Sequence, residues 1–211
     1  MTALITSPDH ERVTNAIREA EARTSGEIYC VLAHQSGDYF YAAGFSVLCA
    51  MVVADVAVAF LLDHLWFSLR LPLFAALEAA AVISVLGLLW VFPAMRLHLV
   101  PRRVLYRTAH DNALRQFLAR NVHRTQNRTG ILIFVSLAEH YATVLADEGI
   151  AEKVPQENWN AIIADLVEAA RTNRLADGYV QAVTASGLLL AEHFPVGLAD
   201  RNELDDHLAE I

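Results

Sequence analysis

The stretch TSGEIYCVLAHQ at residues 24–35 resembles a later stretch, RTGILIFVSLAEH at residues 128–140. Each has a Thr and a Gly before an apolar run that ends in Leu-Ala and, shortly after, a His. Short continuous apolar runs of this kind predict strands that are buried on both faces of a sheet. We therefore expect two strands of one sheet, which resemble each other through internal duplication or by chance.

The other polar segments predict helices around this sheet. Ser7 and Pro8 begin a helix as N-cap and first residue, and the alternation at residues 141–146 predicts a hairpin partner for the second strand, with the turn at Glu139-His140. The acidic tail at residues 199–211 is expected to be exposed. The order of these elements along the chain predicts an α/β fold with a small sheet sandwiched by helices: helix, strand, helix, strand, strand, helix, helix. Further helices are expected at residues 101–122, about 156–173 and 177–193.

The most apolar part of the chain lies between the two resembling strands. Residues 41–62 and 71–92 are two runs of 22 residues with one ionisable side chain each. A helix of that length spans about 33 Å, enough to cross the hydrocarbon core of a bilayer. The alternative is a pair of core helices in a soluble protein. We expect a transmembrane hairpin, residues 41–94, inserted into a split domain of residues 1–40 and 95–211.

Charge predicts the location of this domain. The turn between the apolar runs carries one basic residue, Arg70, whereas the segment after them carries Arg96, Arg102, Arg103 and Arg107. Since positive residues stay inside, the split domain should be cytoplasmic, in a multi-pass protein of the bacterial inner membrane. No cleaved signal peptide is expected at the N-terminus. A net charge of −8 argues against nucleic acid as a partner.

Several stretches together resemble a known family. The run RTGILIFVSLAEHYATVLADEGI at residues 128–150, the helix around Trp159 and the run LADGYVQAVTASGLLLAEHFP at residues 175–195 resemble the TPM domain family, often labelled TPM phosphatase. The N-terminal IREAEARTSGEIYCVLA and the final Asn202–Leu204 fit the same family. The resemblance covers nearly all of the soluble chain, and is strongest to a bacterial membrane branch with a helical hairpin inside the domain.

This resemblance implies an α/β sandwich and two functional properties. Some plant members are described as acid phosphatases, and some members bind divalent metal through acidic loops near the strand ends. Many members have an Asp-Asn pair just before the strand glycine, where this chain has Arg128-Thr129 before Gly130. A cation and a hydroxyl therefore replace a carboxylate that could ligate metal.

Polar residues next to the predicted strands form a candidate site, because ligands of open α/β sheets bind near strand ends. Asp147, Glu148 and Glu139 are candidate ligands for Ca²⁺ or Mg²⁺, although acids beside Gly are also ordinary turn residues. Arg128 with Thr129 could hold a phosphate; we favour the alternative that Arg128 pairs with Glu27 or is a charge at a helix exit. The complete set is Glu27, Arg128, Thr129, Glu139, His140, Asp147 and Glu148.

The apolar runs contain an acidic pair, Asp55 and Glu78, which an antiparallel hairpin places at about the same depth. Each acid costs about 2.5–3.5 kcal/mol near the centre of a membrane helix. Two ionised acids are costly there, so a shared proton is expected. The pair could handle a proton or cation or join two protomers, or it could simply fix the hairpin through hydrogen bonds.

Three functions agree with these observations. The first is a membrane-tethered interaction or assembly-support module without catalysis, which acts with a protein partner or as a homo-oligomer. The second is a metal-assisted phosphomonoesterase, which the family label implies. The third is an oligomeric proton or ion conduit that uses Asp55 and Glu78.

Overall fold

A computed structural model describes residues 5–66, 70–125, 127–196 and 203–211. The chain divides into two compact units. The first unit combines Met1–Ser36 with Arg107–Ile211, and the second is Gly37–Tyr106. The first unit therefore contains both of the resembling strands.

The sheet of the first unit confirms that these two strands are neighbours. Strand β1 (Glu27–Ala33) pairs in parallel with β2 (Gly130–Ser136), from Glu27 opposite Gly130 to Ala33 opposite Ser136. The sheet order is β3-β2-β1-β4. Strand β3 (Tyr141–Ala146) runs antiparallel to β2 in the predicted hairpin, and β4 (Leu208–Glu210) runs parallel to β1.

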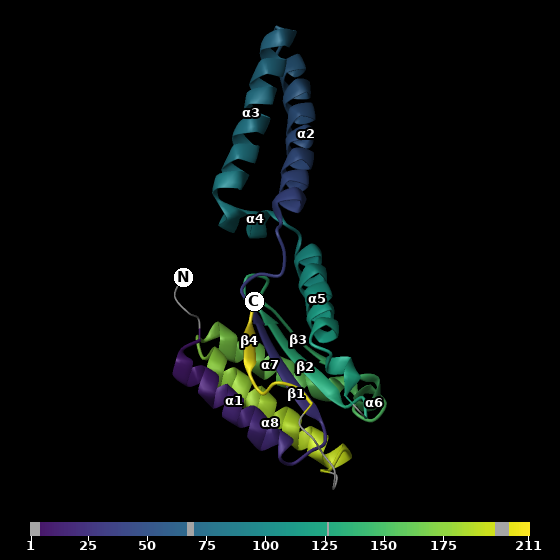
Figure 1. The fold of residues 1–211 in the computed structure, drawn as a ribbon. Coiled ribbons are helices and arrows are strands. Elements are labelled where there is room, and N and C mark those ends of the chain that lie inside the picture. The colour runs from purple at the N-terminus through teal and green to yellow at the C-terminus, as the bar shows by residue number, and fades with distance from the viewer. Residues whose placement is uncertain (1–4, 67–69, 126, 197–202) are drawn as a thin grey trace. The chain divides into compact units, whose positions relative to one another are not determined.

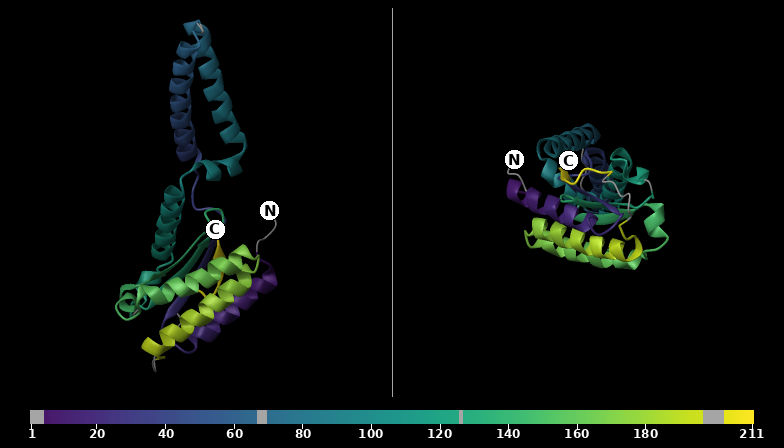
Figure 2. Two further views of the ribbon diagram at one scale, coloured as in Figure 1. Left: turned by 180° about the vertical axis from the view of Figure 1, so that it is seen from behind. Right: turned by 60° about the horizontal axis from the view of Figure 1, so that its bottom comes forward.

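Helices cover both faces of this sheet, as the α/β prediction requires (Figures 1 and 2). Helices α1 (Ser7–Glu21), α7 (Gln156–Arg171) and α8 (Leu175–His193) lie on one face. On the other face, Ala113 and Phe117 of α5 (Arg102–Ala119) join a second cluster of buried residues. All residues of β1 and β2 are buried, which explains why both strands are continuously apolar rather than alternating.

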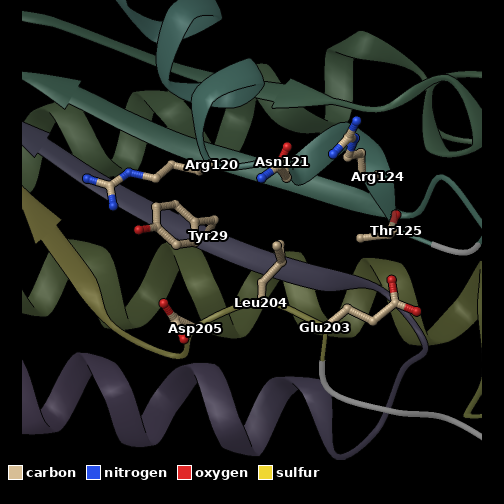
Figure 3. A pocket seen from close by; sticks show the side chains of 8 residues that line it. All are labelled: Tyr29, Arg120, Asn121, Arg124, Thr125, Glu203, Leu204 and Asp205. Carbon is tan, nitrogen blue, oxygen red and sulfur yellow. The ribbon is translucent and has the colours of Figure 1, made fainter.

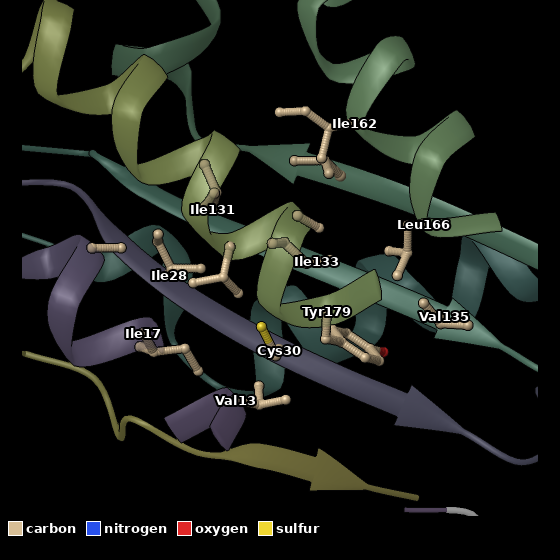
Figure 4. Packing of buried hydrophobic residues seen from close by; sticks show 14 of the residues in the cluster. Val13, Ile17, Ile28, Cys30, Ile131, Ile133, Val135, Ile162, Leu166 and Tyr179 are labelled. Atoms are coloured by element: carbon tan, nitrogen blue, oxygen red, sulfur yellow. The ribbon is translucent and has the colours of Figure 1, made fainter. Parts of the chain in front are cut away.

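The main core lies between the sheet and α1, α7 and α8 (Figure 4). Alternate residues of β1 point into it, because successive side chains of a strand face opposite sides of the sheet: Ile28 and Cys30 join this core, and Tyr29 and Val31 the other. Tyr179 of α8 donates its hydroxyl to the Val31 carbonyl at 2.7 Å.

The prediction of an exposed tail is wrong at its end. Leu208 and Ala209 are buried in β4, and the backbone N–H of Ile211 donates to the Leu32 carbonyl at 2.9 Å. This short strand covers the open edge of β1, which would otherwise present unpaired backbone groups. Helix α1 also differs slightly, because Thr6 rather than Ser7 is its N-cap residue.

The second unit contains α2 (Phe40–His64), α3 (Leu71–Val91) and the short α4 (Pro93–Leu99). Helices α2 and α3 are long and apolar enough to cross a membrane, and almost none of their apolar surface is buried. Arg96 connects the start of α2 with the end of α3. Its guanidinium pairs with Asp38 at 2.7 Å, donates to the Leu89 carbonyl at 2.8 Å and lies over the Phe40 ring.

Two short helices complete the described structure. A 3₁₀ helix, η1 (Val122–Arg124), follows α5, and α6 (Glu148–Ala151) follows β3.

Candidate functional site

The predicted site residues lie at two opposite edges of the sheet. Strands β1 and β2 begin at the edge where the antiparallel strand β3 ends. That edge, which we call the amino edge, carries Glu27, Arg128, Thr129, Asp147 and Glu148. The turn between β2 and β3 lies at the opposite, carboxyl edge and carries Glu139 and His140.

At the amino edge, Thr129 and Glu27 hold the backbone together. The Thr129 hydroxyl donates to the Ser25 carbonyl at 2.9 Å, and its backbone N–H donates to the Thr125 hydroxyl at 2.9 Å. The Glu27 carboxylate accepts the backbone N–H groups of Glu203 and Leu204 at 3.2 and 3.3 Å. Both side chains are buried, so they fasten the start of each strand and the C-terminal segment.

Arg128 forms an ion pair with Glu148. Arg128 has a positive φ of 52°, at the point where the chain turns into β2. Both side chains of this pair are more than half exposed, and exposed pairs contribute about 0–1 kcal/mol because water and salt screen them. Arg128 therefore forms a surface ion pair with Glu148, a partner that the sequence analysis did not name.

Asp147 is the N-cap of α6. Its carboxylate Oδ1 accepts the backbone N–H of Glu148 at 2.7 Å, which satisfies a free N–H at the helix start. This is the turn role that the sequence left open for Asp147.

At the carboxyl edge, Glu139 is the centre of a buried polar network. Its carboxylate accepts the backbone N–H of Ser36 at 2.9 Å and the hydroxyl of Ser136. The two serine hydroxyls lie 2.7 Å apart, and the Asn112 amide donates to Ser36 at 3.3 Å. His140 lies exposed in the turn with a φ of 50°. The sequence analysis missed the two serines and Asn112. A signal for the serines was present, because Ser136 ends β2 and Ser36 follows β1, and polar residues at such strand ends often bind ligands.

The divalent cation that the family resemblance implies does not fit these residues. Glu139 and Asp147 are separated by the full length of β3, about 20 Å at the rise of a strand. Ca²⁺ needs six to eight oxygens in one place. Within the described ranges, no three His, Cys, Asp or Glu residues gather in a group that could hold a metal ion. The structure does not bring the predicted trio of Glu139, Asp147 and Glu148 together.

Asp55 and Glu78, the acids of the two apolar helices, form no hydrogen bond with each other in the described part of the chain. Asp55 is partly exposed on α2 and Glu78 is exposed on α3.

A further acid, Glu21, lies near the amino edge. No sequence pattern indicates it, because it is the last residue of an amphipathic helix. Its Oε1 accepts the Ile28 backbone N–H at 2.9 Å. Burial raises the pKa of Glu21 to about 9, and the nearby charges of Glu27 and Asp206 act in the same direction. Glu21 therefore stays protonated at neutral pH in the folded protein.

Comparisons with known proteins agree with this fold. A family model described as the TPM domain matches residues 94–187, which confirms the resemblance to that family. No curated protein matches the sequence. The solved structure of the BA42 protein from Bizionia argentinensis is similar over 100% of this chain and 98% of that chain, with a TM-score of 0.61 and 16% identity. At this identity the likeness concerns the fold.

Proposed function

Since this chain carries a TPM domain, we propose that it is a membrane-tethered protein of the bacterial inner membrane, with its first unit in the cytoplasm. In this proposal the first unit is a binding or assembly module without catalysis, and α2 and α3 anchor it in the bilayer.

The observation that carries the tether is the exposure of α2 and α3. Phe60, Ile83 and Trp90 are 74%, 71% and 73% exposed, and most large apolar residues of both helices are exposed with them. Core helices of a soluble protein would bury such side chains, because burial stabilises the fold by about 25 cal/mol for each Å² of apolar surface removed from water. A bilayer offers the apolar surroundings that the second unit itself does not supply.

The roles that the strand-edge residues already have support a non-catalytic function. Thr129 and Glu27 hold backbone, Asp147 caps α6, Arg128 pairs with Glu148, and Glu139 holds the loop after β1. A catalytic acid, base or nucleophile must instead reach a substrate. The polar groups of both edges are better explained as parts of a scaffold.

Orientation is tested with a cysteine variant on each side of the proposed membrane. In a Cys49→Ser background, which leaves the buried Cys30 in place, Trp66→Cys marks the turn and Arg103→Cys marks the other side. A membrane-impermeant maleimide should label Trp66→Cys in intact spheroplasts and Arg103→Cys after lysis. The reverse pattern would overturn the cytoplasmic location, and extraction of the protein by alkaline carbonate would overturn the tether.

The assembly role is tested on the full chain in a non-ionic detergent. Light scattering and chemical cross-linking should show a defined homo-oligomer or a defined complex from the native membrane. Hydrolysis of p-nitrophenyl phosphate with added Ca²⁺ or Mg²⁺ should stay at background. Hydrolysis that Asp147→Ala abolishes, while Glu157→Ala does not, would favour the phosphomonoesterase instead.

A further inference from the structure

The first unit contains a pocket whose lining includes none of the site residues that the sequence predicts. Its volume is about 230 Å³. It lies between the C-terminal segment and the end of α5 with η1, and one residue of β1 lines it as well (Figure 3). The lining residues are Tyr29, Arg120, Asn121, Arg124, Thr125, Glu203, Leu204 and Asp205.

Opposite charges line opposite sides of this pocket. Figure 3 shows Arg120 and Arg124 along one side, and Glu203 and Asp205 along the other. In the described part of the chain, Arg120, Arg124 and Asp205 take part in no ion pair. Guanidinium and carboxylate groups pair readily when they meet, so the pocket keeps these charges apart and available to a ligand.

A buried hydroxyl lies between the two charged sides. Tyr29 is 2% exposed, and its hydroxyl has no hydrogen-bond partner among the described residues. The Arg120 guanidinium lies over the Tyr29 ring, 5.8 Å from its centre. Buried polar atoms nearly always have a partner, and an exception calls for a specific cause. A ligand in the pocket would supply that partner once the covering side chains shift.

The size of the pocket restricts the ligand. Sites for drug-sized molecules measure roughly 300–1,000 Å³, so this pocket suits a smaller molecule. Its apolar lining comes from the Tyr29 ring and Leu204, which offer a surface for a short aliphatic group.

We propose that this pocket binds a small zwitterion of the amino-acid type, with its carboxylate at Arg120 and Arg124 and its ammonium group at Asp205. A simple anion would meet the carboxylates of Glu203 and Asp205, and a simple cation would meet two guanidinium groups. A molecule that carries both charges is matched on both sides. This site is independent of the membrane tether, so either proposal can fail alone.

The experiment uses the full chain in a non-ionic detergent. Acidic, basic and neutral pools of the L-amino acids are screened by thermal unfolding, and the members of a stabilising pool are then titrated by calorimetry. Acetate and methylamine are the single-charge comparators. We expect a neutral amino acid to bind, and either comparator to bind at least about tenfold more weakly, because each lacks one charge-assisted contact.

Variants then assign the binding to this pocket. Arg120→Ala and Asp205→Asn should each weaken binding about 10- to 100-fold, and Tyr29→Phe should weaken it less. Arg115→Ala is the matched control, since Arg115 is exposed on α5, the helix that ends just before Arg120, and lies outside the pocket. The proposal is overturned if no amino acid binds, if acetate binds equally well, or if Arg115→Ala weakens binding as much as Arg120→Ala.

Discussion

The carboxylate of Glu139 accepts the backbone N–H of Ser36 at 2.9 Å. This bond joins the loop after β1 to the turn after β2, at the last residue before the chain enters its second unit. The hydroxyl of Ser136 binds the other carboxylate oxygen. The network therefore fixes the point at which the chain leaves the sheet for the apolar helices.

Glu139→Ala should destabilise the first unit by about 2–3 kcal/mol, because it leaves a partly buried N–H and a buried hydroxyl without their acceptor. Glu148→Ala removes an exposed ion pair and should cost about 1 kcal/mol or less. Denaturant unfolding is followed by the fluorescence of the buried Trp159 in a Trp66→Phe, Trp90→Phe background. Equal losses for the two variants would contradict a structural role for the network.

The start of β2 gives a steric prediction. A Cβ added to Gly130 would lie 2.3 Å from the Val122 carbonyl oxygen, which is backbone and cannot rotate away. Gly130→Ala should therefore cost about 3 kcal/mol or more. Gly87→Ala is the control, because nothing lies within 4 Å of that position and Ala favours helix by up to about 1 kcal/mol. A Gly130→Ala protein that unfolds like the wild type would contradict this packing.

The sheet could be predicted from the sequence where burial leaves a continuous pattern. Ile28 to Ala33 and Ile131 to Val135 are apolar because helices cover both faces, and that pattern is local to each strand. Strand β4 could not be predicted in this way. It has three residues inside an acidic segment, and Leu208 becomes buried only when the chain end returns to β1.

Individual residues of the candidate site could be predicted from the sequence, but their grouping in space could not. The sequence identified Glu139 and Asp147 as residues that follow strands, but placing them together requires the direction of each strand. The antiparallel β3 carries Asp147 back to the amino edge and leaves Glu139 at the carboxyl edge. Pocket residues such as Arg120 and Asp205 come from segments about 80 residues apart and share no sequence pattern.

Glu21 gives the first unit a predictable pH dependence. Its pKa is about 9 in the folded protein, against 4.5 as the reference value, so between these values the folded state binds one proton more than the unfolded state. The contribution of Glu21 to the free energy of unfolding should therefore fall as the pH rises from about 5 to 9, by at most about 1.4 kcal/mol for each pH unit. Above about pH 9 both states are ionised and the loss is complete.

Glu21→Gln should remove this slope and raise stability near pH 8, because Gln carries no charge to bury. Glu19→Gln, at an exposed position of the same helix, should keep the wild-type slope. Unfolding midpoints measured by Trp159 fluorescence at several pH values compare the three proteins. A slope that Glu21→Gln leaves unchanged would assign the pH dependence to other groups.

The apolar acids give the last prediction. Glu78 is exposed on α3, and Asp55 is partly exposed on α2. An acid that faces lipid costs about 2.5–3.5 kcal/mol near the helix centre, whereas a polar contact with a second protomer returns about 0.6–2 kcal/mol. We expect Asp55→Asn with Glu78→Gln to leave membrane insertion intact, since neutral amides are no harder to insert than acids.

The same double variant should weaken self-association about 3- to 30-fold, the range that corresponds to such a contact. Ser84→Ala is the control, because the Ser84 hydroxyl is already bonded to the Ala80 carbonyl of its own helix at 2.7 Å. Cross-linking yields and light scattering over a range of detergent concentrations measure the change. If insertion fails, the acids serve the hairpin itself. If insertion and association are both unchanged, these acids do not join protomers.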